Sequence, residues 1–452
     1  MKNGNQDMLR GPLGINIIRY TIPIILTSFL QLLFNAADLV VVGQYCGSVS
    51  VGAVGATGAL TNLIVNLFIG LSVGAGVTVA HALGGHENEA ASRTVHTALP
   101  AALVSGIILT VVGVLFSETF LRLMDTPESV LPLSAVYMKI YFGGITFTMV
   151  YNFCASILRA AGDTKSPLVF LSIAGVINVV LNVLFVRAFD MNVAGVALAT
   201  IISQGISAVA MVVVLMRRTD ACRLVLSKMR FHKVQLIKIL RIGLPAGIQS
   251  SLFSISNVLI QSSINSFGSI AMAGNSAASN IEGFIYTAMN AMHQANLTFA
   301  SQNLGAKQFG RVRKVMWVCL GTVTAIGLGM GVVFLGLGPT LLGFYNTDPE
   351  VIRFGMVRMT IIMPTYFLCG LMDVMVGQLR GIGYSIMPMI VSLTGACLLR
   401  VVWIYTIFAA NPTLETLYNS YPISWFATFA THLLCYLIWG KRKLKRMELS
   451  QA

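Results

Sequence analysis

The chain has 452 residues, of which 56% are hydrophobic and only 10% are charged, and its formal net charge is +14. Soluble domains carry roughly a quarter charged residues, so this composition excludes a set of soluble domains. Charge-poor runs of about 20 residues recur from one end of the chain to the other, which is the length of a helix that crosses a bilayer. The sequence therefore predicts an all-α membrane protein, and it contains no soluble basic domain that would bind nucleic acid.

Charged residues and turn formers separate twelve predicted spans. In chain order these are 20–43, 52–80, 95–117, 132–155, 167–187, 193–216, 243–266, 270–300, 315–338, 354–377, 386–409 and 423–440. The polar segment before the first span is too long for a secretory signal peptide, so this span is expected to be retained.

The basic residues predict the orientation of the chain. With the N-terminus inside, 24 of the 30 Lys and Arg residues fall in the two terminal segments and in the connections on the same side of the membrane. The positive-inside rule therefore places both termini in the cytoplasm. The net positive charge therefore mainly reflects the predicted topology.

The chain contains an internal duplication. Four landmarks recur at a spacing of 221 or 222 residues: Pro23 and Pro245, Gly84 and Gly305, Pro127 and Pro349, and Arg159 and Arg380. The predicted organisation is a six-helix N-lobe (1–215), a cytoplasmic basic linker (216–242), a pseudo-symmetric six-helix C-lobe (243–440) and a cytoplasmic basic tail (441–452). Parallel repeats of this kind are typical of secondary transporters.

Ionisable residues inside spans are the first candidates for function, because each costs roughly 2.5–3.5 kcal/mol to insert. Asp38 lies in the first span, and Gln31 and Asn35 precede it on the same helix face. Asn178 and Asn182 lie one turn apart in the fifth span, and Thr200 lies in the sixth. Such oxygen groups suit a small cation, and a desolvated carboxyl group suits a proton equally well. The alternative is that the amides and the hydroxyl only join neighbouring helices.

The second half has a different set of polar candidates. Asn257 matches Asn35, but Ile260 stands where the first half has Asp38. Its candidates for the substrate cavity or for coupling are Asn257, Glu282, Met289, Met292, His293 and Asp373. Arg400 could pair with either Glu282 or Asp373, in which case the pair could be purely structural.

The sequence gives no case for catalysis. GLSVG at 70–74 fits a nucleophile pattern but lies in an apolar helix with no preceding strand. A phosphate-binding G-x-x-x-x-G-K-[ST] motif is absent, and the seven cysteines are scattered without zinc or disulfide spacing.

The chain resembles the multidrug and toxic compound extrusion (MATE) family of secondary transporters, and the resemblance covers essentially its whole length. It rests on the six-plus-six repeat and on four local patterns. These patterns are Pro23 followed by DLVVVGQYCG, the L-G element in ALGG and NLGA, LRAAGD with its echo LRGIG, and N-x-x-L-N followed by GVALATIISQ.

The resemblance implies two six-helix lobes that export organic cations against an inward flow of Na⁺ or H⁺. It places a cation site, for Na⁺ if sodium is the coupling ion, at Asp38, Asn178, Asn182 and Thr200. Many members carry an acid where this chain has Asn182, so the expected site holds one carboxylate instead of two.

We therefore expect the protein to be a non-enzymatic antiporter of the bacterial-type cytoplasmic (inner) membrane that works by alternating access. It would export amphipathic or cationic drugs or metabolites as a monomer, with Na⁺ or H⁺ as coupling ion and no cofactor. A lipid-linked oligosaccharide flippase of the same broader superfamily and a passive channel or membrane scaffold are the alternatives.

Overall fold

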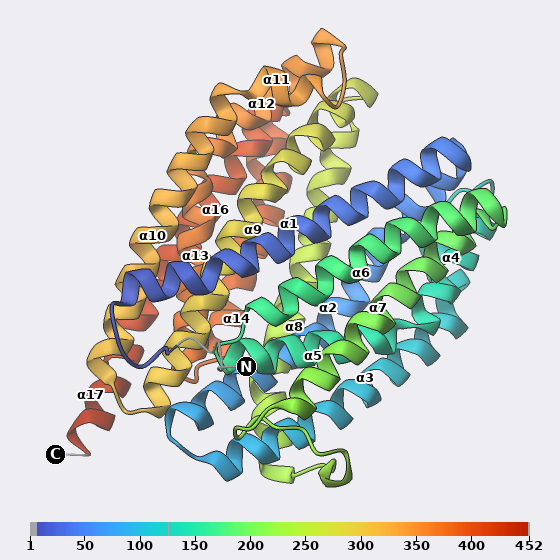
Figure 1. The fold of residues 1–452 in the computed structure, drawn as a ribbon. Helices are drawn as coiled ribbons and strands as arrows, with labels where there is room; N and C mark the ends of the chain where they lie inside the picture. Colours follow the sequence, from blue (N-terminus) through green and yellow to red (C-terminus); the bar gives the residue numbers. More distant parts are fainter. Residues whose placement is uncertain (1–6, 125, 451–452) are drawn as a thin grey trace. The chain divides into compact units, whose positions relative to one another are not determined.

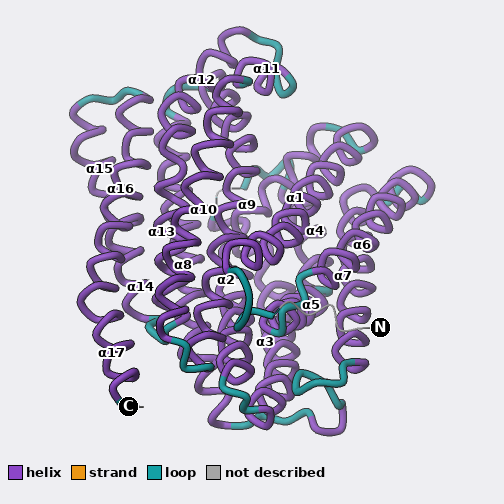
Figure 2. The backbone as a smooth tube through the Cα atoms, turned by 60° about the vertical axis from the view of Figure 1, so that its left-hand side comes forward, coloured by secondary structure: helices purple, strands orange, loops and turns teal. Residues whose placement is uncertain are grey.

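A computed structural model describes residues 7–124 and 126–450, and this part of the chain is helical with no β-strand (Figure 1 and Figure 2). Helices are expected for these apolar runs, because in a bilayer each backbone N–H and C=O group must be hydrogen-bonded within the protein. The predicted all-α membrane class is confirmed.

The chain divides into two compact units. Unit 1 is formed by Ile22–Ser251, and unit 2 by Met8–Thr21 together with the chain from Leu252 onward. Helices α1 and α8 therefore each contribute residues to both units. The predicted lobe and linker bounds remain a prediction.

The helices as far as α8 are long, and most are continuous. They are α1 (Leu13–Tyr45), α2 (Ser48–Gly84), α3 (Asn88–Leu123), α4 (Leu131–Gly143), α5 (Ile145–Ala160), α6 (Lys165–Val183), the π-helical turn η1 (Leu184–Ala188), α7 (Asn192–Arg217), the short 3₁₀ turn η2 (Leu226–Lys228) and α8 (Lys233–Asn265).

The helices after α8 are interrupted more often. They are α9 (Ser269–Gly305), α10 (Phe309–Gly336), α11 (Gly338–Gly343), α12 (Pro349–Ile362), the 3₁₀ turn η3 (Met363–Thr365), α13 (Tyr366–Gly381), α14 (Ile386–Ser392), the π turn η4 (Leu393–Leu398), α15 (Leu399–Trp403), the π turn η5 (Ile404–Phe408), α16 (Leu414–Cys435), the π turn η6 (Tyr436–Gly440) and α17 (Lys441–Leu449).

Ten helices of the described chain are long and apolar enough to cross a membrane. α4 and α5, which bend by 48° where they meet, are long and apolar enough for an eleventh crossing if the pair forms one span. The remaining predicted span, 270–300, falls on α9, a continuous helix of 37 residues that is rich in Asn, Gln and Ser. The count of twelve spans and the side of the membrane on which the termini lie remain predictions.

The duplication is visible in the backbone itself. The left-handed residues His86 and Lys307 lie 221 positions apart, and the glycines with positive φ repeat the spacing, Gly47 with Gly268 and Gly162 with Gly383. A positive φ is rare for a residue other than glycine, so the shared position of His86 and Lys307 shows that both halves make the same turn. The π turns η1 and η5 recur 220 positions apart.

Glycines allow α2 to contact the first half of α8 within unit 1. A Cβ atom on Gly70 would lie 2.2 Å from the backbone nitrogen of Gly247, and one on Gly247 would lie 2.0 Å from the carbonyl oxygen of Leu67. Both obstacles are backbone atoms, which no side-chain rotation can move. Glycine is therefore required at this crossing.

The segment between α7 and α8 is folded against unit 1. His96 in α3 accepts a hydrogen bond from the backbone N–H of Val225 at 3.0 Å, and its own carbonyl oxygen accepts one from Arg230 at 3.2 Å. Cys222 is fully buried. Its backbone N–H is capped by the Asp220 carboxylate, which also pairs with Arg218. The predicted basic linker is therefore a docked segment of this unit.

Candidate functional site

Three helices of unit 1 bring a carboxylate, two amides and a hydroxyl together. Asp38 comes from α1, Asn178 and Asn182 from successive turns of α6, and Thr200 from α7. The Asn182 amide nitrogen donates to Asp38 and also, at 3.2 Å, to the Asn178 side-chain oxygen. Asn178 donates in turn to the Thr200 hydroxyl at 3.4 Å. The four residues predicted from the sequence thus lie in one hydrogen-bonded cluster, here named the Asp38 cluster.

The burial of the Asp38 cluster leaves one oxygen without a partner. Asn182 is 0% exposed and Asn178 5%, whereas Asp38 is partly exposed. The side-chain oxygen of Asn182 is buried and accepts no hydrogen bond from the described chain. An unsatisfied buried acceptor is costly, and a cation beside Asp38 would satisfy it. The cluster therefore fits a small cation that prefers oxygen ligands.

A carboxylate also fits a proton, and the Asp38 side chain is partly exposed. Protonation of Asp38 would remove its negative charge while leaving an oxygen to accept from Asn182. No group of three or more His, Cys, Asp or Glu side chains in the described chain is placed to hold a metal ion. The donor set is thus one acid with neutral oxygens.

The local structure of α6 fixes the position of the amides relative to α1. A Cβ atom on Gly175 would lie 1.8 Å from the Phe34 ring, so the glycine allows α1 to approach α6 one turn before Asn178. Directly after α6, the chain forms the π turn η1. Such turns are frequent at functional sites. Tyr137 of α4 packs against an apolar cluster that includes Val42, four residues after Asp38, and was missed by sequence reasoning because tyrosine is common in spans.

The other polar candidates on α1 and α8 have exposed side chains. Gln31 and Asn35 are exposed on α1, and Asn257 is exposed on α8. The structure does not assign them to the Asp38 cluster, and their role in a substrate cavity stays a prediction.

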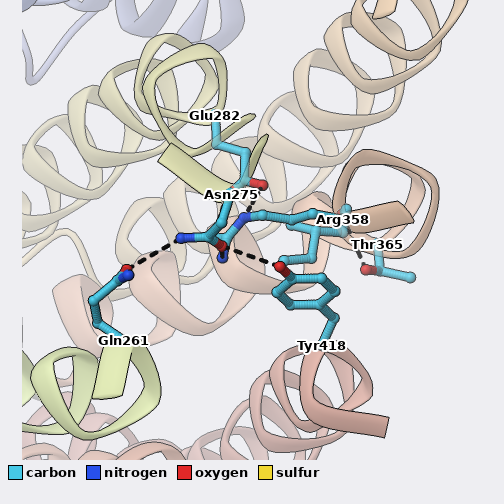
Figure 3. Close-up of polar contacts among 7 residues, drawn as sticks. Gln261, Asn275, Glu282, Arg358, Thr365 and Tyr418 are labelled. Atoms are coloured by element: carbon cyan, nitrogen blue, oxygen red, sulfur yellow. Dashed lines mark hydrogen bonds and ion pairs between the residues drawn. The ribbon is translucent and has the colours of Figure 1, made fainter. Parts of the chain in front are cut away.

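Unit 2 contains a buried ion pair at the centre of a polar network (Figure 3). Arg358 of α12 donates from two nitrogens to the two oxygens of Glu282 in α9, each at 2.7 Å. A further nitrogen of Arg358 donates to Asn275 at 2.8 Å, and the Tyr418 hydroxyl donates to the same Asn275 oxygen at 3.2 Å. The Asn275 amide then donates to Gln261 of α8 at 3.1 Å. Four helices of the second unit are joined by this network.

The proposed pairing of Arg400 with Glu282 is wrong, because Arg358 occupies both oxygens of that carboxylate. Asp373 does not pair with Arg400 among the described ion pairs either. Instead, Arg400 donates to the Ser424 hydroxyl at 2.8 Å and lies over the Tyr421 ring at 4.3 Å from its centre. Sequence reasoning considered Arg400 and missed Arg358, although Arg358 lies inside a predicted apolar span and gives an equally strong signal.

The remaining candidates of unit 2 lie where α9 meets α13. His293 donates from Nδ1 to the backbone carbonyl of Asp373 at 2.6 Å. Met289 and Met292 are fully buried, and the Met289 sulfur packs against Gly370. The structure thus places the two methionines in the helix packing, and their part in substrate binding stays a prediction.

The comparisons with known proteins agree with the fold and the repeat. The family model described as MatE matches the chain twice, over residues 23–184 and 245–406, which together exceed half its length. The two matches start 222 residues apart, so they coincide with the internal duplication.

Several curated relatives cover most of the chain. The probable multidrug resistance protein YoeA of Bacillus subtilis is 27% identical over 95% of this chain and 94% of its own length. The probable multidrug resistance protein NorM of Thermotoga maritima is 26% identical over 83% of this chain and 82% of its own.

Solved structures share the fold. One, described as the outward-facing conformation of a multidrug resistance MATE family transporter, matches with a TM-score of 0.90 at 20% identity, covering 99% of each chain. Because the family model matches both halves of the duplication, the chain belongs to the MatE family, the multidrug and toxic compound extrusion transporters.

Proposed function

We propose that this protein is a secondary active transporter that exports amphipathic organic cations or related metabolites in exchange for Na⁺ or H⁺. The family and the names of the relatives support export. The observation that carries the choice of ion exchange is the Asp38 cluster, in which one carboxylate is held by Asn182 beside a buried oxygen without a partner.

In this proposal the coupling ion binds at Asp38. A bound Na⁺ would take oxygen ligands from Asp38, Asn178, Asn182 and Thr200, whereas a proton would bind the carboxylate alone. Either ion neutralises the only acid of the cluster, and so changes the free energy of the protein conformation that holds it. Coupling then requires that ion and substrate favour different conformations.

The bacterial relatives and the positive-inside pattern support a place in the cytoplasmic (inner) membrane, with both termini inside. The basic helix α17 at the end of the described chain carries five Lys and Arg residues in KRKLKRMEL. Such a helix suits the anionic surface of the cytoplasmic leaflet.

Transport into proteoliposomes tests the proposal and identifies the ion. Purified protein is reconstituted, and uptake of a fluorescent organic cation is followed while a Na⁺ gradient and a pH gradient are imposed separately, with protein-free liposomes as control. The proposal expects concentrative uptake under one gradient. Equilibration at the same rate without any gradient would show a passive channel and contradict it.

A further inference from the structure

Arg400 is a buried guanidinium group that lacks a carboxylate partner. Its side chain is on α15, inside the predicted span 386–409, and is 3% exposed. None of the seven ion pairs found in residues 7–124 and 126–450 includes it. Its Nε donates to the Ser424 hydroxyl, and its terminal nitrogens make no hydrogen bond within the described chain. A buried charge without a partner is unfavourable, so this group is suited to an external anion.

The neighbouring Arg358 already has a carboxylate partner, and that carboxylate does not neutralise Arg400. Arg358 is neutralised by both oxygens of Glu282 and is further held by Asn275. The two guanidinium groups lie against the same ring, Tyr421, with Arg358 at 5.2 Å and Arg400 at 4.3 Å from its centre. The two arginines and Glu282 therefore leave one net positive charge, and it lies at Arg400.

Two aromatic rings, Tyr421 and Trp425, lie against this charge. Trp425 lies 5.8 Å from the Arg400 guanidinium, and its ring contacts Tyr421 at 5.6 Å and Tyr366 at 5.2 Å. The half-buried Tyr421 ring and the buried Trp425 ring lie beside a planar donor group that matches carboxylate, sulfonate or phosphate oxygens. A ligand that used both features would combine an anionic group with an aromatic body.

The backbone around Arg400 is irregular on both sides. The π turn η4 precedes α15 and the π turn η5 follows it. Only η5 has a counterpart in the described part of unit 1, the turn η1, so η4 is a feature of the second half. Within η4, a Cβ atom on Gly395 would lie 2.3 Å from the Thr428 hydroxyl, which shows that α16 contacts this turn closely. Irregular turns of this kind mark functional positions in helices.

We propose that Arg400, Tyr421 and Trp425 form a subsite for the anionic group of an aromatic substrate, such as an aryl carboxylate or sulfonate. The subsite rests on the proposed transport function and adds amphipathic aromatic anions to its substrates. Arg400 binds the oxygens, Ser424 orients the guanidinium, and the rings of Tyr421 and Trp425 contact the aromatic body.

Equilibrium binding in detergent tests the subsite with two permanently charged probes that share one ring system, 2-naphthalenesulfonate and (2-naphthyl)trimethylammonium. Calorimetric titration of the full chain should show that Arg400→Gln raises the Kd for the sulfonate at least about tenfold, equivalent to about 1.4 kcal/mol, and leaves the Kd for the ammonium probe unchanged. Arg400→Lys should keep part of the sulfonate affinity, because it keeps the charge without the planar fork.

Two further variants control for general electrostatics and for folding. Arg442→Gln removes an exposed charge of α17 and should not change the Kd for the sulfonate. Ser424→Ala keeps the charge of Arg400 but removes the hydroxyl that orients it, and should weaken sulfonate binding alone by several-fold. This variant carries the test if Arg400→Gln does not fold.

Three results would overturn the subsite. The first is an unchanged sulfonate Kd in Arg400→Gln or in Ser424→Ala, and the second is binding of the ammonium probe only. The third is loss of sulfonate binding on addition of phosphatidylglycerol, which would assign Arg400 to a lipid headgroup. Since the titration uses no ion gradient, it can fail while gradient-driven transport succeeds, and the reverse also holds.

Discussion

At the scale of the single residue, the clearest contrast lies between the ion pair Glu282–Arg358 and the ion pairs at exposed positions. Glu282 is 4% exposed and Arg358 5%, and both oxygens of the carboxylate are used. Arg313 pairs with Glu448 over a similar distance, 3.0 Å, but the two side chains are 35% and 49% exposed. Water screens the second pair and not the first, so the two should differ in energy.

Replacement of one partner measures that difference. Glu282→Gln leaves Arg358 buried without its counter-charge, and the free energy of unfolding should fall by about 3–5 kcal/mol. Glu448→Gln is the matched control at an exposed pair and should cost less than about 1 kcal/mol. Unfolding in detergent measures both values, and equal midpoints for the two variants would contradict the interpretation of Figure 3.

The candidate site illustrates what a sequence can and cannot predict at this scale. Asp38, Asn178, Asn182 and Thr200 were predictable as a set because charge and amide groups are rare in spans and the family pattern joins them. The partner of Glu282 was not predictable, because Arg358 is 76 residues away and only packing brings it within reach. Tyr137 of α4 gave no signal that distinguished it from other span tyrosines.

At the scale of the helix, close contacts depend on small residues. Gly175→Ala would place a methyl group 1.8 Å from the Phe34 ring. The displacement of α1 from α6 should lower the free energy of unfolding by about 1–3 kcal/mol, and should reduce ion-driven transport because Asp38 follows Phe34 by one turn.

Two variants make this prediction specific. Gly55→Ala lies on α2 with open space around the added methyl group and should change neither stability nor transport appreciably. Gly175→Ala combined with Phe34→Ala removes the obstacle and should recover part of the transport. Full activity of the single Gly175→Ala variant would show that this contact does not set the site.

The segment between α7 and α8 is a second feature at this scale. The reactivity of its cysteine, Cys222, tests whether the segment is docked on unit 1. Burial raises the pKa of the Cys222 thiol to about 12, and the neighbouring Asp220 carboxylate adds to that shift. Thiols react as thiolates, so Cys222 should resist N-ethylmaleimide at pH 8 in the native protein and react after unfolding. Ser227→Cys, at an exposed position of the same segment, should be labelled in the native state.

Peptide mapping by mass spectrometry measures both labels. Rapid labelling of native Cys222 at the rate seen for Ser227→Cys would mean that the segment is a mobile linker and not a docked part of unit 1. A charge-rich stretch predicts only exposure to water, so its docking on α3 through His96 was not visible in the sequence.

At the scale of the whole molecule, the duplication organises the fold. Its spacing of 221 or 222 residues was readable from four landmarks, and the turns at His86 and Lys307 confirm it in the backbone. The repeat does not extend to the polar groups, since unit 1 has a lone carboxylate in its cluster and unit 2 a buried arginine without a carboxylate partner. The number of membrane spans was less predictable, because α9 is long but too polar to qualify as a span by composition.

The proposed coupling site in unit 1 rests on Asp38, and replacement of that one residue tests it most directly. In proteoliposomes under the gradient that drives the wild type, Asp38→Asn should show no more substrate accumulation than protein-free liposomes, because no carboxylate remains to exchange the ion. Asp38→Glu, which keeps the carboxylate, should retain part of the accumulation, and Glu415→Gln, which removes an exposed acid, should retain all of it. Accumulation by Asp38→Asn at the wild-type level would contradict the assignment of the coupling site.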